Sequence, residues 1–409
     1  MHFEFNFYSS LLLVFFIHGL VYAILLLRKS IVNESRADRW LSLFLILCIL
    51  YIFPWMVGFA GWYDTQPYRD ILFYTPFQHL FFIGPVIFFY VQNLLNPSFS
   101  FSKKDWLHFF PGILYTFYSC IILITDKLII NEYYFLADGE DRDFDTWYQL
   151  SGFISMFIYF ITSFIYYNRY RKMVIQVVSF ADLVSFRWIK NFLLAFLIIL
   201  IVRSLFFILG LLFDMEYWDV WWYFLAFSLL FYYIAINGYA NSVVARLSFS
   251  IDIFNNKKPL LLFYKSANNE IHEAEIIEEV NTGNKQSEKF ISEEWKQKIL
   301  KAVLEEKLYE DPELTLPDLA KHLDTNLSIL SKMINQGFKM NFNDFINYYR
   351  VQAVISKLIS GEQKKQTLLG IAYDCGFNSK ATFNRAFKKV TLKSPKEYIA
   401  ALPEDKYIN

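Results

Sequence analysis

Cysteine is scarce in this sequence, and the residue types that usually build catalytic or metal sites are scattered along it. The three cysteines, Cys48, Cys120 and Cys375, lie far apart in 409 residues, so we expect no disulfide framework. The six histidines are equally dispersed, and no His or Cys cluster has metal-ligand spacing. No phosphate-binding glycine-rich loop, nucleophile elbow or zinc-protease helix occurs. We therefore expect no metal, no cofactor and no catalytic residues, and we do not expect an enzyme.

A net charge is also lacking, because 39 Lys and Arg balance 39 Asp and Glu, while apolar residues are abundant. Hydrophobic residues make up 55% of the chain and aromatic residues 20%, more than a soluble protein of this length carries. A helix needs roughly 20 apolar residues to cross a bilayer core. Seven such runs are present: Phe7 to Leu27, Leu41 to Phe59, Ile71 to Leu95, Phe109 to Thr125, Tyr148 to Tyr167, Asn191 to Phe213, and Val220 to Ile236. We therefore predict that a seven-helix part has the lipid bilayer as a partner.

The Lys and Arg residues between these runs predict the orientation. Glu4 precedes the first run, no Lys or Arg does, and no small-residue cleavage site follows, so we expect this run to be retained. Alternate loops carry eleven cations: Arg28, Lys29, Arg36, Arg39, Lys103, Lys104, Arg169, Arg171, Lys172, Arg187 and Lys190. The other loops carry three: Arg69, Lys127 and Arg142. Because cytoplasmic loops retain Lys and Arg, we predict a multi-pass chain in the inner (cytoplasmic) membrane, with its N-terminus outside and its C-terminus in the cytoplasm.

The charges that cancel overall are unevenly distributed toward the C-terminus. Residues 327–399 carry twelve Lys and Arg against four acids, a net of +8, whereas residues 250–288 carry four Lys against seven acids, a net of −3. A basic segment suits attraction to nucleic-acid phosphates. The acidic, polar stretch predicts a linker, which we place at residues 246–288. The apolar patch from Pro259 to Tyr264 within it fits either a docked strand or a contact with the membrane surface.

Two helix-turn-helix patterns follow within residues 314–400. Apolar residues of the first recur at helical spacing: Leu316, Leu319, Ala320 and Leu323, then Leu327, Leu330, Met333 and Ile334. The second has helical patterns from Leu368 to Cys375 and from Lys380 to Lys389. Residues suited to capping stand before the four helices: Thr315, Asn326, Thr367 and Ser379. Gly376 occupies the place where a left-handed residue would end a helix.

The second helix of such a unit fits the major groove of double-stranded DNA, and its outward side chains should be short and polar or cationic. The residues predicted to contact DNA are Asn326, Ser328, Ile329, Ser331 and Lys332 in the first unit, and Ser379, Lys380, Ala381, Asn384, Arg385 and Lys388 in the second. Asn326 and Ser379 are expected mainly as caps whose helices present N–H groups to phosphates. The alternative for the cations is a solvated charged surface.

Further positions agree in order and spacing with a known family. The stretch from Ile371 to Thr391 is followed by Ser394-Pro-Lys-Glu-Tyr398, and the stretch from Leu330 to Asn335 by Asn341 to Asn347 and Tyr349-Arg350. Together they resemble the AraC/XylS family of transcription regulators, over roughly residues 289–400. The family usually has a glycine before the Asn-Phe and the Ser-Pro segments, where this chain has Lys339 or Met340, and Leu392. The resemblance implies sequence-specific DNA binding.

Two more helices are expected around the first unit. Residues 293–308 have an amphipathic pattern, with Ser292 as a candidate cap, and should pack on the first unit. Residues 342–358 should form a connecting helix about 25 Å long, at ~1.5 Å per residue. A rod of that length can place two recognition helices in successive major grooves, about 34 Å apart, so one chain could bind two adjacent half-sites.

Two features of the N-terminal part leave alternatives open. Arg203 lies midway along the sixth apolar run, where a cation should face the helix bundle or a wet cavity. Its role is either a structural hydrogen-bonding partner inside the bundle or part of a signal site. An outer loop carries five acids, Asp138, Glu140, Asp141, Asp143 and Asp145, without calcium-loop spacing. A solvated acidic loop is therefore favoured over a cation site.

These patterns together predict an all-α chain: a seven-transmembrane-helix bundle at residues 1–245, the linker, and a cytoplasmic double helix-turn-helix domain at residues 289–402. We expect a membrane-anchored transcription regulator that couples an unknown signal to promoter binding through residues 238–250. Homodimerisation through the membrane domain would double the DNA contacts. Two alternatives remain: a seven-helix receptor whose helical module binds a protein partner, and a membrane enzyme or transporter with a fused regulatory module.

Overall fold

The chain forms two compact units. The computed structural model describes residues 4–96, 99–181, 187–213, 215–241, 249–252, 260–264, 271–275 and 293–401. Unit 1 comprises Met1–Tyr167 and Arg187–Val244, and unit 2 comprises Asn168–Phe186 and Ala245–Asn409. The division differs from the predicted domains at residues 168–186, which belong to unit 2. Ser292 and most of the segment 238–250, to which sequence patterns gave a cap and a signalling role, lie outside the described residues.

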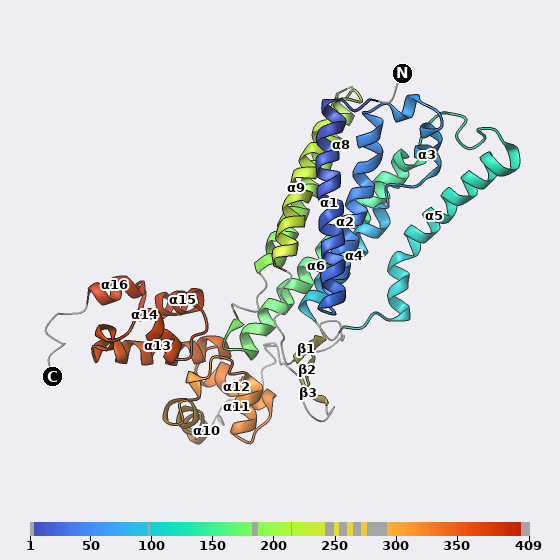
Figure 1. The fold of residues 1–409 in the computed structure, drawn as a ribbon. Helices are drawn as coiled ribbons and strands as arrows, with labels where there is room; N and C mark the ends of the chain where they lie inside the picture. The colour runs from blue at the N-terminus through green and yellow to red at the C-terminus, as the bar shows by residue number, and fades with distance from the viewer. Residues whose placement is uncertain are drawn as a thin grey trace. The chain divides into compact units, whose positions relative to one another are not determined.

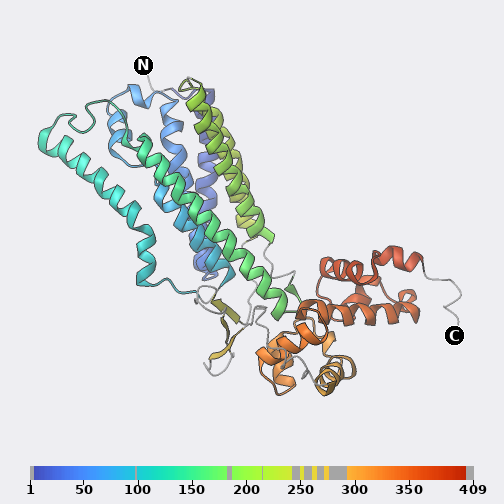
Figure 2. The ribbon, with the colours of Figure 1, turned by 180° about the vertical axis from the view of Figure 1, so that it is seen from behind.

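Unit 1 is a bundle of long apolar helices, drawn from two sides in Figures 1 and 2. Its helices are α1 (Phe7–Val32), α2 (Arg36–Gly58), α3 (Tyr68–Tyr74), α4 (Leu80–Leu95), α5 (Phe110–Leu123), the first part of α6 (Thr146–Val177), α8 (Arg187–Leu212) and α9 (Val220–Ala240). Six helical stretches among the described residues are long and apolar enough to cross a membrane, by length and composition. They are Phe7–Val32, Arg36–Gly58, Lys103–Ile130, Thr146–Val177, Trp188–Leu212 and Val220–Ala240.

The third predicted run, Ile71 to Leu95, is not one helix, and the prediction of a seventh full-length span is wrong at this position. The run divides into α3 and the shorter α4, and the residues between them include Pro76. Proline lacks a backbone N–H and disfavours a helical conformation at the residue before it, so the helix breaks there. With 16 residues, α4 is about 24 Å long, which is less than the ~30 Å of a bilayer core.

Helix α4 lies inside the bundle instead of facing outward. Nearly all of its residues are buried, whereas α1, α5, α6 and α8 leave many large apolar side chains exposed. It packs closely on α6 through two glycines. A Cβ added at Gly84 would lie 2.7 Å from the ring of Tyr159, and one at Gly152 would lie 2.5 Å from Leu80. These glycines therefore allow α4 and α6 to approach each other at van der Waals distance.

A small antiparallel sheet occurs within the predicted linker. Strand β2 (Leu260–Tyr264) pairs with β1 (Phe249–Asp252) on one side and with β3 (Ile271–Glu275) on the other. Residues 260–264 of the apolar patch, for which a strand was one of two predicted alternatives, thus form the central strand. All other secondary-structure elements among the described residues are helices. The all-α prediction therefore holds for both main parts of the chain, and the small sheet is an exception to it.

Unit 2 is built on helix α13 (Phe342–Ile359). Two hydrophobic clusters lie along it, and Ala353 packs against both. The first cluster holds α10 (Glu293–Leu300), α11 (Leu316–His322) and α12 (Leu327–Gly337); the second holds α14 (Leu368–Asp374), α15 (Lys380–Thr391) and α16 (Pro395–Ala400). Figure 1 shows α11 and α12 near one end of α13 and α14 to α16 along the other. The predicted connecting helix is confirmed. The predicted amphipathic helix is confirmed only in part, because α10 ends at Leu300, a π-helical turn follows at Lys301–Glu305, and Leu308 begins a separate 3-10 turn.

Candidate nucleic-acid interface and candidate signal site

The first helix-turn-helix unit begins at a capping box. The Thr315 hydroxyl accepts from the amide of Asp318, and the Asp318 carboxylate accepts from the amide of Thr315 at 3.1 Å. At the next helix, the Asn326 side-chain oxygen accepts from the amide of Ile329 at 2.8 Å. These bonds satisfy helix N–H groups that have no partner within the helix. Both predicted caps are confirmed, and they fix where α11 and α12 begin.

The second unit repeats this construction. The Thr367 hydroxyl accepts from the amide of Gly370, and the Ser379 hydroxyl from the amide of Thr382, both at 3.1 Å. Gly376, between the two helices, has φ +86°, the left-handed region predicted for it. A Cβ there would lie 2.2 Å from the carbonyl oxygen of Tyr309, so any other residue would meet both backbone strain and a steric clash.

The predicted DNA-contacting side chains lie on the outer faces of α12 and α15. Asn326, Ile329 and Lys332 are exposed, and Ser328 and Ser331 are half-buried. On α15 the exposed residues are Lys380, Ala381, Asn384, Arg385 and Lys388, while Ser379 at its start is half-buried. The opposite face of α15 is buried in the second cluster through Thr382, Phe383, Ala386 and Phe387. Each second helix therefore presents a polar face at the surface and buries an apolar one.

Two cations of α15 interact with other charged residues of unit 2: Arg385 lies near Arg171, and Lys389 is paired with Asp344. Partial burial, followed by the positive charge of Arg171 on α6, lowers the pKa of Arg385. Arg171 belongs to the part of α6 that packs in unit 2, so α6 lies close to the second recognition helix. Lys389 forms an ion pair with Asp344 at 2.7 Å. That ion pair joins α15 to α13. Because Lys389 is already paired with an acid, it is less available to bind a DNA phosphate.

At each of the two places where the family usually has glycine, one residue adopts the conformation that glycine favours: Lys339, of the pair Lys339 and Met340, and Leu392. Lys339 has φ +54° and Leu392 has φ +61°, both left-handed. Each follows a recognition helix, and Leu392 is 84% exposed. An L-residue in this region carries a steric cost that glycine avoids. The loops thus keep a glycine-like backbone despite the substituted residues.

A buried arginine joins the two halves of unit 2. Arg350 of α13 is fully buried, and its guanidinium donates to the carbonyl oxygens of Tyr309 (2.8 Å) and Asp311 (2.6 Å). It also lies 5.9 Å from the ring centroid of Phe377 in the second unit. Burial lowers the pKa of Arg350 to about 10, and Asp311 opposes this shift. Desolvation of the cation is offset by hydrogen bonds to several oxygens.

The segment that follows α6 inserts at this arginine. Ser179 is fully buried; its hydroxyl donates to the carbonyl of Leu314 at 2.8 Å and accepts from Arg350 at 3.0 Å. The Ser179 carbonyl accepts from the amide groups of Asn343 (2.8 Å) and Asn347 (3.1 Å), both on α13. The backbone of Val178 is paired with that of Thr315, the cap of α11. Every polar atom of Ser179 is therefore bonded within unit 2.

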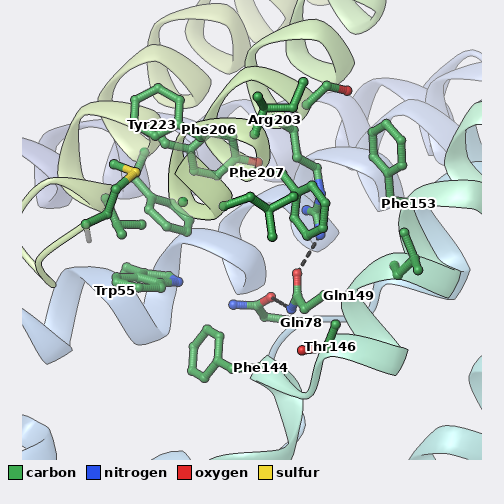
Figure 3. A pocket seen from close by; sticks show the side chains of 18 of the residues that line it. Trp55, Gln78, Phe144, Thr146, Gln149, Phe153, Arg203, Phe206, Phe207 and Tyr223 are labelled. Atoms are coloured by element: carbon green, nitrogen blue, oxygen red, sulfur yellow. Dashed lines mark hydrogen bonds between the residues drawn. The ribbon is translucent and has the colours of Figure 1, made fainter. Parts of the chain in front are cut away.

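Arg203 lies in unit 1, at a cavity of about 610 Å³ (Figure 3). Its guanidinium donates to the hydroxyl of Tyr51 at 2.8 Å and to the side-chain oxygen of Gln149. The sequence had left a structural or a signal role open, and the structure gives Arg203 hydrogen-bonding partners and also access to a cavity. The sequence predicted that Arg203 faces the bundle or a cavity, but not which residues form the wall, because they come from α2, α6, α8, α9 and the loops between helices.

The acidic outer loop is not fully solvated, in contrast to the prediction, because Asp141 and Asp143 are buried in structural hydrogen bonds. Asp143 accepts from the hydroxyl of Tyr115 at 2.6 Å and from the amides of Phe77 (2.8 Å) and Gln78 (2.9 Å). Burial and then the charge of Asp143 raise the pKa of Asp141 well above its ordinary value. In the part of the chain that is described, no group of three or more His, Cys, Asp or Glu residues could hold a metal ion.

Comparisons with known proteins concern the C-terminal segment. Residues 319–401 match the family model described as a helix-turn-helix domain. The match agrees with the two helix-turn-helix units that the structure shows in this segment. Similar proteins include uncharacterized HTH-type transcriptional regulators of Staphylococcus aureus strains COL, MSSA476 and N315, each 31% identical over 91 residues. The similar region covers 22% of this chain and 12% of each relative. No solved structure matches the chain.

Sequence reasoning missed the contact between α6 and the helix-turn-helix domain. Residues 169–190 were interpreted only as a cationic loop, and Arg350 only as part of a family pattern. One signal was present: Met173, Val174, Val177 and Val178 are apolar at helical spacing just past the predicted membrane run, and all four are buried. That pattern indicates a buried helix face beyond the predicted membrane run.

Proposed function

We propose that this protein is a membrane-anchored, sequence-specific DNA-binding transcription regulator that couples a signal at the membrane or outer face to promoter binding. The observation that carries the proposal is the pair of outward polar faces on α12 and α15, held by one continuous helix, α13. The 18 residues of α13 span about 27 Å. That length suits two recognition helices entering successive major grooves on one side of the duplex.

The DNA contacts divide into two kinds. Side chains on the outward faces would contact base edges or phosphates: Ser328, Ile329, Ser331, Lys332, Lys380, Ala381, Asn384, Arg385 and Lys388. The capped helix starts at Asn326 and Ser379 would direct backbone N–H groups to phosphates. The net charge of +8 on residues 327–399 would supply salt-dependent attraction to DNA.

The membrane topology follows the cation bias of the loops. Six helical stretches have the length to cross a bilayer, and α4 is buried by its neighbours, so it need not match the thickness of the lipid. We infer that α4 passes through the bundle within this shell of protein. The N-terminus then lies outside and the helix-turn-helix domain in the cytoplasm of the inner membrane. A second copy of the chain could contribute a further pair of DNA-binding units as a homodimer.

Helix α6 is the proposed coupling element. Its residues Thr146–Tyr167 belong to unit 1 and Asn168–Val177 to unit 2, and the helix is about 48 Å long at ~1.5 Å per residue. Ser179 lies two residues past its end and is bonded to α13 and to Leu314, just before the start of α11. A movement of α6 along or about its axis would therefore act on the element that spaces the two recognition helices.

The test is selection from a random duplex library by the full-length protein in phosphatidylcholine nanodiscs, at two salt concentrations. Enrichment of a motif with two boxes about one helical turn apart supports the proposal. The same selection is run with Ser179→Ala. If the contact of Ser179 with α13 keeps the wild type from binding DNA, this variant would still enrich the motif. Salt-sensitive binding by both proteins without any enriched motif contradicts the proposal and favours a cationic module for a protein partner.

A further inference from the structure

We propose that the cavity around Arg203 binds an amphipathic anion, a ligand with an apolar body and a single anionic head such as a carboxylate. This inference rests on the proposed function and deepens it, because it names the chemical class of the signal. The ligand would place its head on the guanidinium of Arg203 and its apolar body against the aromatic walls.

The cavity has the size and the lining of a small-molecule site. Its volume of about 610 Å³ falls within the roughly 300–1,000 Å³ typical of ligand pockets. Apolar and aromatic side chains form most of the wall, among them Trp55, Phe144, Phe153, Phe206, Phe207 and Tyr223, which Figure 3 shows around Arg203 and Gln149. Such a lining favours an apolar body, and it leaves the few polar groups to orient one end of the ligand.

Arg203 lacks an anionic counterpart among the described residues. Its hydrogen-bonding partners Tyr51 and Gln149 are neutral, and Tyr51 is bonded in turn to the hydroxyl of Tyr223 at 2.9 Å. No ion pair to Arg203 occurs within the described part of the chain. A cation within a membrane-spanning bundle is costly, and an anion within reach would lower that cost. A guanidinium binds carboxylates through two parallel N–H donors.

A second polar group in the wall is left without a partner. The indole N–H of Trp55 is buried, and no hydrogen-bond acceptor for it occurs among the described residues. Trp55 lines the same cavity as Arg203. A buried donor without an acceptor is costly, and a ligand oxygen would satisfy it. The cavity therefore offers both a cationic and a neutral donor to an anionic head.

The cavity also involves the helix that is proposed to carry the signal. Thr146, Gln149 and Phe153 in the first turns of α6 belong to its wall. Gln149 accepts from Arg203 and donates to the side chain of Gln78 at 2.7 Å. An anion that engages Arg203 competes with the oxygen of Gln149 for the same donors. Binding would thereby change how the outer end of α6 is held, while its other end leads to Ser179.

The experiment measures binding of radiolabelled dodecanoate to the full-length protein in phosphatidylcholine nanodiscs, with empty nanodiscs as background. We expect saturable binding that Arg203→Gln weakens about tenfold or more, because a charge-assisted hydrogen bond is lost. Arg203→Lys keeps part of the affinity, and Ser204→Phe, which fills the cavity beside an intact Arg203, removes binding. Arg39→Gln, an exposed arginine at the start of α2, is the matched control and leaves affinity unchanged.

Further arms distinguish the source of the anion. Mass spectrometry of the protein released from mixed phosphatidylcholine and phosphatidylglycerol nanodiscs measures retained anionic lipid. Retention that depends on Arg203, with no dodecanoate binding, assigns the site to a lipid headgroup of the same chemistry. Equal binding of dodecanol and dodecanoate, or equal binding of either anion to wild type and Arg203→Gln, overturns the proposal. None of these results depends on DNA binding, so a failure here and a failure of the proposed function are separable.

Discussion

The hydroxyl of Ser179 accepts a hydrogen bond from the guanidinium of Arg350 at 3.0 Å, 171 residues away along the chain. The donor lies on α13, between the two clusters of the helix-turn-helix domain, and the acceptor lies two residues past the end of α6. Because Arg350 is also bonded to Tyr309 and Asp311, the contact joins α6 to the loop that precedes the first unit. Arg350 thus connects α13, the segment after α6 and the loop at Tyr309 and Asp311.

Replacement of this serine should loosen α6 from the DNA-binding region. Ser179→Ala removes the acceptor for Arg350 and the donor to Leu314, and leaves buried polar atoms unsatisfied at a cost of about 1–3 kcal/mol. Hydrogen exchange of the full-length protein should increase across residues 170–181. Ser360→Ala, an exposed serine bonded to the carbonyl of Lys357, is the control and should leave exchange there unchanged. Equal exchange in both variants would show that the Ser179 contacts contribute little.

The turn of the second unit should tolerate no side chain. Gly376→Ala combines φ +86° with a Cβ 2.2 Å from the carbonyl of Tyr309, so we expect a loss of more than about 2 kcal/mol in the stability of unit 2. Denaturant unfolding monitored by far-UV circular dichroism would measure it. Gly61→Ala in unit 1 provides the control for backbone strain alone, measured as the stability of unit 1, because Gly61 has φ +91° but no atom within 4 Å of its Cβ position. It should cost only about 1 kcal/mol. Similar losses in the two variants would contradict the steric explanation.

Replacement of Leu392, the left-handed residue after α15, by glycine should increase the stability of unit 2. Leu392→Gly relieves the backbone strain at φ +61° and removes a side chain that is 84% exposed, so it should stabilise unit 2 by about 1 kcal/mol. Thermal unfolding of the full-length protein is the measurement. Leu392→Ala removes most of the side chain but keeps Cβ, and it should give no comparable gain. If alanine and glycine stabilise equally, exposure of leucine and not backbone strain is the cause.

The outward lysines should contribute to the salt dependence of DNA binding. Lys332→Gln and Lys388→Gln should each reduce the slope of log affinity against log salt by about 1, because each removes one phosphate contact. Fluorescence anisotropy with a labelled duplex at several salt concentrations measures the slope. Lys389→Gln is the matched control, since Lys389 is paired with Asp344 at 2.7 Å and should change the slope less. Equal slopes for Lys388→Gln and Lys389→Gln would argue against the assigned outward face.

The buried acid of the outer loop should make stability depend on pH. Burial and the charge of Asp143 raise the folded-state pKa of Asp141, so between its ordinary and its raised pKa the folded state binds more protons than the unfolded state. Stability should therefore fall as pH rises through that interval. Asp141→Asn keeps the oxygen that accepts from the amide of Asp143 and should flatten the dependence. Thermal unfolding between pH 4 and 8 tests this, and an unchanged pH profile in the variant would refute it.

The sequence predicted the helix-turn-helix domain well because its determinants are local. Thr315, Asn326, Thr367 and Ser379 bond to amides three residues onward, and the left-handed glycine at Gly376 is a property of one turn. Such interactions act over a single helical turn and can be inferred from spacing. The break in the third apolar run was missed, although Pro76 signals it, because hydropathy alone does not distinguish one long helix from two short ones.

The amino-acid sequence by itself determined the elements of this protein: long apolar helices for a bundle, capped helices in two repeated units, and a connecting helix between them. Only the tertiary structure decided which distant groups meet. Ser179 is hydrogen-bonded to Arg350, and Arg203 to Tyr51 and Gln149. These bonds join segments that are tens of residues or more apart along the chain. Hydrophobic burial is non-directional and sets which faces are hidden, whereas hydrogen bonds require specific partners at specific distances. Sequence pattern and spacing therefore predict which faces are buried, whereas only the folded chain shows which groups are hydrogen-bonded to each other.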